Sequence, residues 1–102
     1  MVKHIVMWKL DASYSETEKK ELVKEFESKL LQLEGKISVL KSIAVHFNSP
    51  QASDKNFDIL LDTSFSTMDD LETYRVHPEH QKVVKWVGEL KLENRACVDY
   101  EN

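Results

Sequence analysis

Apolar and polar residues alternate at the start of the chain, over residues 2–10. One face of this segment carries Val2, His4, Val6, Trp8 and Leu10. A period of two is typical of a β-strand, so we predict a first strand here. Ser15 and Glu18 then form a capping box ahead of apolar residues at helical spacing, which predicts a helix that ends at Gly35.

Strand and helix patterns continue to alternate along the chain. β-branched residues predict a second strand over about residues 37–47, and "FDILLDTSF" predicts a third over residues 57–65. A helix is then expected to open at Ser66, with Met68 and Leu71 facing inward. This stretch therefore supplies two strands and the start of a second helical region.

Pro78 interrupts this second helical region. The residue before a proline is disfavoured in the helical conformation, so His77 should mark a boundary. A further helix follows, and its apolar residues are Val83, Val84, Trp86, Val87 and Leu90. "RACVDY" closes the chain as a fourth strand.

The order strand–helix–strand–strand–helix–strand predicts a single α+β domain over residues 1–102. It is the order of a ferredoxin-like βαββαβ subunit, with a four-stranded antiparallel sheet and the helices on one face. The first strand also carries apolar residues on its other face, among them Met7. A sheet face exposed to solvent should be polar, so we expect a second copy of the sheet to cover this apolar face. The chain would then be a homodimer through the sheet face.

Composition narrows the classes of partner. The chain has 41% hydrophobic and 31% charged residues and a formal net charge of -4, without the basic stripe that a nucleic-acid binder needs. No apolar run is long enough to span a bilayer, so we expect no membrane partner. The single cysteine, Cys97, suits a reducing, cytoplasmic setting and is expected to be a buried or half-buried strand thiol.

The segment "YRVHPEHQKVV" gathers residues that are able to move protons. With Pro78 as the first helical residue, His80 lies in the first turn, where the helix dipole favours a neutral imidazole. Such a ring can act as a general base, and Tyr74 can lie nearby across the kink. His4 falls on the helix side of the first strand. Each of these residues can equally be a packing or capping residue, and that alternative stays open.

A metal site is the other candidate for this segment. His77 and His80 have the spacing of helical ligands, but His77 should not be helical, and no cysteine or carboxylate cluster completes a set. We therefore predict no metal site here. The chain also has only 2 glycines and no phosphate-binding loop, so no cofactor is expected.

Two motifs carry a family resemblance. "VKHIVMWKL" at the start and "YRVHPEH" before the last helix resemble the stress-responsive dimeric α/β-barrel family, often called Dabb. The resemblance covers nearly the whole chain. It implies a ferredoxin-like subunit whose sheet packs face to face with its twin, forming a barrel across the dimer.

The family resemblance also implies a site. The family includes plant stress-associated proteins and the polyketide cyclase that makes olivetolic acid, in which a histidine and a tyrosine drive an aldol-type cyclisation without a cofactor. The matching positions are His80 for the base and Tyr74 for its partner, with His4 and His77 as the other matching histidines. Trp8 departs from the cyclase, which has smaller aliphatic residues along this strand, and its indole can fill the pocket.

Two functions follow as alternatives. One is a stress-responsive barrel-domain homodimer with a small apolar pocket in each subunit and no proven catalysis. The residues expected at this pocket are His4, Val6, Trp8 and His77, with a small hydrophobic molecule as its possible ligand. The other is a cofactor-independent enzyme, similar to the polyketide cyclase, in which His80 and Tyr74 perform acid–base chemistry on a small hydrophobic carbonyl compound.

Overall fold

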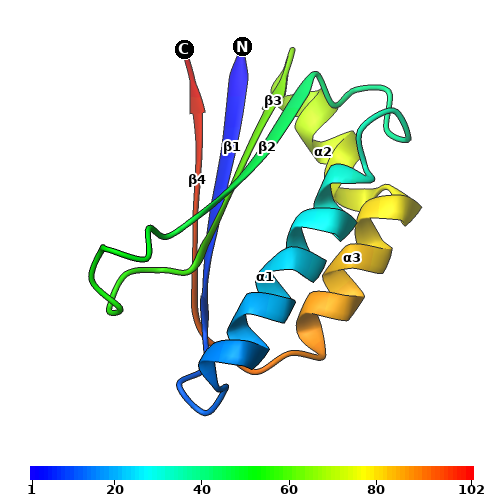
Figure 1. The fold of residues 1–102 in the computed structure, drawn as a ribbon. Helices are drawn as coiled ribbons and strands as arrows, with labels where there is room; N and C mark the ends of the chain where they lie inside the picture. Colours follow the sequence, from blue (N-terminus) through cyan, green and yellow to red (C-terminus); the bar gives the residue numbers. More distant parts are fainter.

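The computed structural model describes residues 1–102 and has the predicted ferredoxin-like fold (Figure 1). Its elements are, in order, β1 (Val2–Leu10), α1 (Glu16–Leu31), β2 (Ser42–Phe47), β3 (Ile59–Phe65), α2 (Met68–Val76), α3 (Pro78–Gly88) and β4 (Leu92–Glu101). The strands form one antiparallel sheet in the order β2-β3-β1-β4. No helix is both long and apolar enough to cross a membrane.

The helices cover one face of the sheet, and the other face is bare (Figure 1). The predicted alternation of β1 is confirmed: its residues are buried and half-buried in turn, and His4, Val6 and Trp8 face the helices. The core lies between the two layers, where Phe26 and Leu30 of α1 meet the sheet. Because β1 is the inner strand beside the edge strand β4, its side chains lie at the centre of this layer.

The start of α1 is confirmed, but its predicted end is wrong. Ser15 Oγ accepts a hydrogen bond from the Glu18 N–H, and the Glu18 carboxylate accepts one from the Ser15 N–H. The helix ends at Leu31, ahead of Gly35, which has a φ of 83° in a turn further on. The chain leaves the helix early because Ile37, in that turn, is itself buried in the core.

Two further boundaries also differ from the prediction. The second strand covers only Ser42–Phe47, because residues 37–39 form a bend and a turn that place Leu40 against the core. The cap of α2 is Thr67, one residue after Ser66, since the Thr67 hydroxyl accepts from the Asp70 N–H. This shift leaves Met68 exposed, while Leu71 is buried as predicted.

The predicted break at the proline is confirmed. His77 has an extended backbone (φ -64°, ψ 136°) and Pro78 is the first residue of α3. A proline costs no hydrogen bond at this position, since an N–H here would have no acceptor inside the helix. The break lets α3 leave α2 at an angle and pack along the sheet beside α1 (Figure 1).

The bare face of the sheet carries apolar side chains. Strand register places Ile5 and Met7 of β1 on this face with Leu60 of β3. On the edge strand β4, Val98 and Tyr100 share the face and are 55% and 44% exposed. Such exposed apolar area on one continuous face is typical of a surface that packs against another protein.

Candidate functional site

A cavity of about 530 Å³ lies between the sheet and α3. Its walls are largely apolar, and its polar side chains are two histidines, two arginines and a glutamine. The lining residues from the sheet and the strand ends are His4, Val6, Trp8, Leu61, Leu90, Leu92 and Arg95. Those from the helices are Leu30, Arg75, His80, Gln81, Val83, Val84, Val87 and Gly88. Its volume is within the range of small-molecule sites.

Trp8 forms a wall of this cavity and does not fill it. The indole ring packs at 5.1 Å from the Phe26 ring, which in turn packs at 5.1 Å from the Trp86 ring. This aromatic row anchors the indole toward α1. The indole, which by its size can fill the pocket, leaves it open because the ring packs beside the cavity against Phe26.

His80 lies in the first turn of α3 and lines the cavity. Its Nδ1 is 3.0 Å from the backbone oxygen of Arg75. A carbonyl oxygen only accepts, so Nδ1 carries the proton and Nε2 keeps a free lone pair. Burial lowers the pKa of His80; this hydrogen bond partly opposes that shift, and the electrostatic influence of His4, Arg75 and Arg95 reinforces it. The ring is thus a neutral hydrogen-bond acceptor.

Tyr74 is next to His80 but does not line the cavity. The two rings lie 4.3 Å apart, and the Tyr74 ring also packs at 5.0 Å from Phe65. The Tyr74 side chain is fully buried and its hydroxyl has no hydrogen-bond partner. Burial raises the pKa of Tyr74, so the phenol is protonated and is able only to donate or accept a hydrogen bond.

His77 was expected at the pocket, and the structure places it elsewhere. Its Nδ1 accepts a hydrogen bond of 3.1 Å from the Glu79 N–H, so the side chain caps α3. A cap residue points along the start of its own helix, and His77 does not reach the cavity. The structure therefore brings together His4, Val6, Trp8 and His80, with Tyr74 behind His80.

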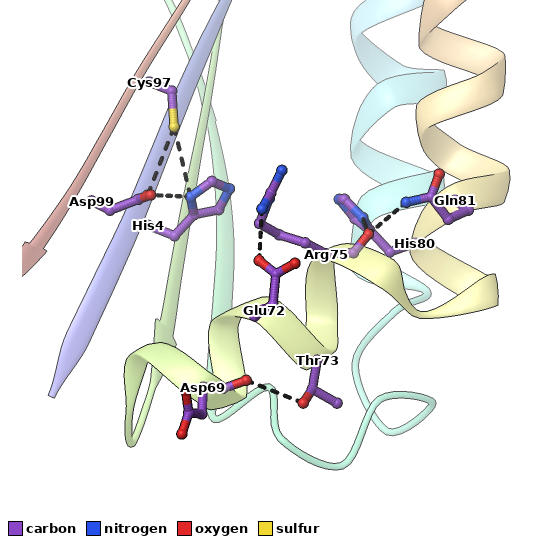
Figure 2. A network of polar contacts seen from close by, with 9 residues as sticks. All are labelled: His4, Asp69, Glu72, Thr73, Arg75, His80, Gln81, Cys97 and Asp99. Atoms are coloured by element: carbon purple, nitrogen blue, oxygen red, sulfur yellow. Dashed lines mark hydrogen bonds and ion pairs between the residues drawn. The ribbon is translucent and has the colours of Figure 1, made fainter.

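His4 is the polar residue of β1 on the helix side, and it is 6% exposed. Its Nδ1 pairs with the Asp99 carboxylate of β4, and Cys97 Sγ lies 3.7 Å from the same nitrogen (Figure 2). The ring also faces the edge of Tyr74 at 6.3 Å. This pairing orients the imidazole, so its other nitrogen is directed away from β4, toward Arg75 in Figure 2.

Sequence reasoning missed Gln81 at the cavity wall and four further polar residues at the cavity or beside His4. Arg75 and Arg95 line the cavity, and Cys97 and Asp99 hold His4. Cys97 is exposed on the edge strand, contrary to the expectation of a buried or half-buried thiol, because no element covers β4. Burial and the Asp99 carboxylate raise the pKa of Cys97, so the thiol is a poor nucleophile. Alternation along β4 was the available signal for Arg95, Cys97 and Asp99, whereas Arg75, on α2, had no such signal.

Comparison with known proteins identifies close similarities over the whole chain. The model of the family "Stress responsive A/B Barrel Domain", Dabb, matches residues 2–102. A crystal structure from Bacteroides fragilis, described as a dimeric protein of unknown function with a ferredoxin-like fold, is 38% identical. The alignment covers 99% of this chain and 95% of that one, with a TM-score of 0.88.

Two more distant structures share the fold. A dimeric ferredoxin-like protein of unknown function from Thermobifida fusca is 21% identical, covering 99% of this chain and 90% of that one, with a TM-score of 0.79. A Dabb family protein from Mesorhizobium loti is also 21% identical, covering 99% and 95%, with a TM-score of 0.68. No curated protein matches the sequence.

Proposed function

Because the chain belongs to the stress-responsive A/B barrel domain family, we propose that it is a homodimer in which each subunit binds one small, largely apolar molecule. The observation that carries this proposal is the open cavity of about 530 Å³ beside His80. Well-packed interiors seldom keep voids larger than a water molecule, so an apolar space of this size is a candidate ligand site.

The polar residues of the cavity indicate which ligand fits. Arg95 and Arg75, the latter also paired with Glu72 at 2.6 Å, supply positive charge, and the arrangement favours an electron-rich group such as a carbonyl or carboxylate near them. Val83, Val87 and Leu30 supply apolar walls for the rest of the molecule. The ligand proposed is therefore a small hydrophobic compound with an oxygen-bearing end.

Gly88 allows a clean test of the cavity. It lines the space at the end of α3, and a Cβ built there meets no atom within 4 Å, so a side chain can begin there without a backbone clash. The probe is anilinonaphthalene sulfonate, an apolar anion whose fluorescence rises in apolar sites. Gly88→Phe should weaken probe binding about tenfold or more, a change of about 1.4 kcal/mol.

Gly88→Ala is the matched control, since it adds one methyl group and leaves most of the volume open. It should bind the probe as the wild type does. Equal binding by Gly88→Phe would contradict the proposed site and would place the probe elsewhere, for example on the bare sheet face.

The homodimer is proposed to form through that bare face. Val98 and Tyr100 supply exposed apolar area there, and a second sheet packed on it completes a barrel. The similar proteins from Bacteroides fragilis and Thermobifida fusca are described as dimeric, which supports a homodimer. Val98→Asp should yield a monomer in sedimentation velocity, and Val76→Asp, at an exposed position at the end of α2, should not. A wild-type monomer at micromolar concentration would refute the proposal.

A second candidate function, proton transfer on a carbonyl compound, rests on the hydrogen bond between His80 Nδ1 and the Arg75 oxygen. It leaves Nε2 free as a general base in the cavity. Tyr74, kept protonated by burial, is the proposed partner behind the ring. Deuterium exchange next to the carbonyl of 2-octanone, followed by NMR, tests this: His80→Gln should abolish any exchange above the buffer rate. No exchange by the wild type would remove this candidate and leave ligand binding.

A further inference from the structure

Three potential metal ligands converge at the edge of the sheet, on the side of the helices. The register between β1 and β4 pairs His4 with Asp99 and Val6 with Cys97. Cys97 and Asp99 are two residues apart on one strand, so both side chains point at His4 Nδ1 (Figure 2). We propose that His4, Cys97 and Asp99 form a binding site for a divalent transition metal of the zinc class.

The spacing of the donor atoms suits such an ion. All three lie within 4.8 Å of one another, and Sγ of Cys97 is 3.7 Å from both His4 Nδ1 and Asp99 Oδ1. Zinc bonds of about 2.3 Å to sulfur and about 2.1 Å to nitrogen or oxygen place tetrahedral donors about 3.6 Å apart. Two of the three distances between donor atoms, those from Cys97 Sγ, therefore already have the length that a bound ion needs.

The third pair of donor atoms, His4 Nδ1 and Asp99 Oδ1, is joined by a hydrogen bond, and the ion takes the place of its proton. The proton of His4 Nδ1 moves to Nε2, and the Cys97 thiol releases its proton to water on coordination. The Asp99 side chain is 34% exposed, so it has room to turn as the two donors move apart. Thiolate, carboxylate and a divalent ion then sum to zero charge, which lowers the cost of holding the ion beside a protein core.

The donor types select the class of metal. A thiolate and an imidazole favour zinc and similar transition ions over magnesium and calcium, which prefer sites made of oxygen. Three protein ligands leave one position of a tetrahedron for water or another molecule. His4 also lines the cavity, so that position lies near the proposed ligand site, although the metal proposal does not depend on the ligand proposal.

The positive charge of Arg95 disfavours the binding of a cation at this site. Arg95 is close enough to Cys97 to lower the pKa of the thiol, against the larger effects of burial and Asp99. Its side chain is exposed and has room to swing into solvent. Removing this positive charge with Arg95→Ala should tighten metal binding, whereas a cluster that only orients His4 would give no such response.

Cobalt is the probe for the test. Metal-free protein, kept reduced with a phosphine, is titrated with Co²⁺, which gains an ultraviolet charge-transfer absorption when a thiolate binds it. The chain has 1 cysteine, so the absorption reports on Cys97 alone. We expect one Co²⁺ for each subunit and its displacement by equimolar Zn²⁺. Absence of the absorption, or displacement by equimolar Mg²⁺, would overturn the proposal.

Variants at exposed positions keep the test separate from folding. Cys97→Ser should abolish the absorption, and Asp99→Asn should weaken Co²⁺ binding about tenfold or more, since even outer-shell partners contribute that much. His46→Gln, on the opposite face of the sheet, is the matched control and should change nothing. Gly88→Phe should also bind Co²⁺ normally, so a failure of the cavity proposal is distinguishable. Unchanged affinity in Asp99→Asn would refute the site.

Discussion

The unpartnered hydroxyl of Tyr74 offers a sharp test of the reasoning about the core. Tyr74→Phe removes one oxygen and leaves the ring against Phe65 and His80. A buried polar group without a hydrogen bond costs about 1–3 kcal/mol. We therefore expect the free energy of unfolding to rise by about 1 kcal/mol, which for a domain of about this size is a rise in Tm of about 4–8 °C.

Tyr14→Phe is the matched control with the opposite sign. The Tyr14 hydroxyl accepts a hydrogen bond of 3.0 Å from the Lys91 N–H, so its removal should lower the free energy of unfolding by about 1 kcal/mol. Both variants are compared with the wild type by urea unfolding at one protein concentration, because a dimer's stability depends on concentration. If Tyr74→Phe destabilises the protein as Tyr14→Phe does, the Tyr74 hydroxyl has a partner and the reasoning fails.

Three further predictions concern the cavity wall, the helix cap and His80. Trp8→Ala should lower the free energy of unfolding by about 3 kcal/mol or more, since Phe26 loses the indole as its packing partner. A loss below about 1 kcal/mol in urea unfolding would contradict the packing described. Ser15→Ala should lower the free energy of unfolding by about 1 kcal/mol, with Ser38→Ala, at an exposed position outside the cap, as its control. The folded pKa of His80 lies below the unfolded value near 6.5, so the unfolded chain binds the proton first as pH falls. Wild-type stability should therefore decline from about pH 7 through pH 6.5, and His80→Gln should flatten that part of the profile; an unchanged slope would contradict the shift.

Local patterns made most of the fold predictable. The alternation of β1 and the capping box of Ser15 and Glu18 depend only on residues close in sequence. The errors arose where tertiary packing decides. Gly35 is a good helix terminator, but burial of Ile37 made the chain turn earlier, at Leu31. Similarly, the apolar residues before Ser42 serve the core from turns, where a β-branched pattern alone would place a strand.

The candidate site was less predictable for a geometric reason. His4 and Asp99 are 95 residues apart and meet only because β1 and β4 pair in one particular register. A cavity is likewise a property of how far α3 stands from the sheet, which no single residue determines. The position of Trp8 illustrates this: the sequence gives the size of the indole, but only the packing against Phe26 decides that it borders the cavity.

The helix junction alone does not account for His80. His77 supplies the cap of α3, and Pro78 sets the break, so the junction is complete without a second histidine. The Arg75 carbonyl that His80 contacts also accepts a hydrogen bond of 2.6 Å from Gln81 Nε2, so it would stay satisfied. What His80 adds is a neutral ring at the wall of an open cavity, packed against Tyr74, whose hydroxyl has no hydrogen-bond partner. An open cavity and a buried hydroxyl without a partner are both departures from a well-packed interior, and such departures tend to occur at functional sites. Here both lie beside His80.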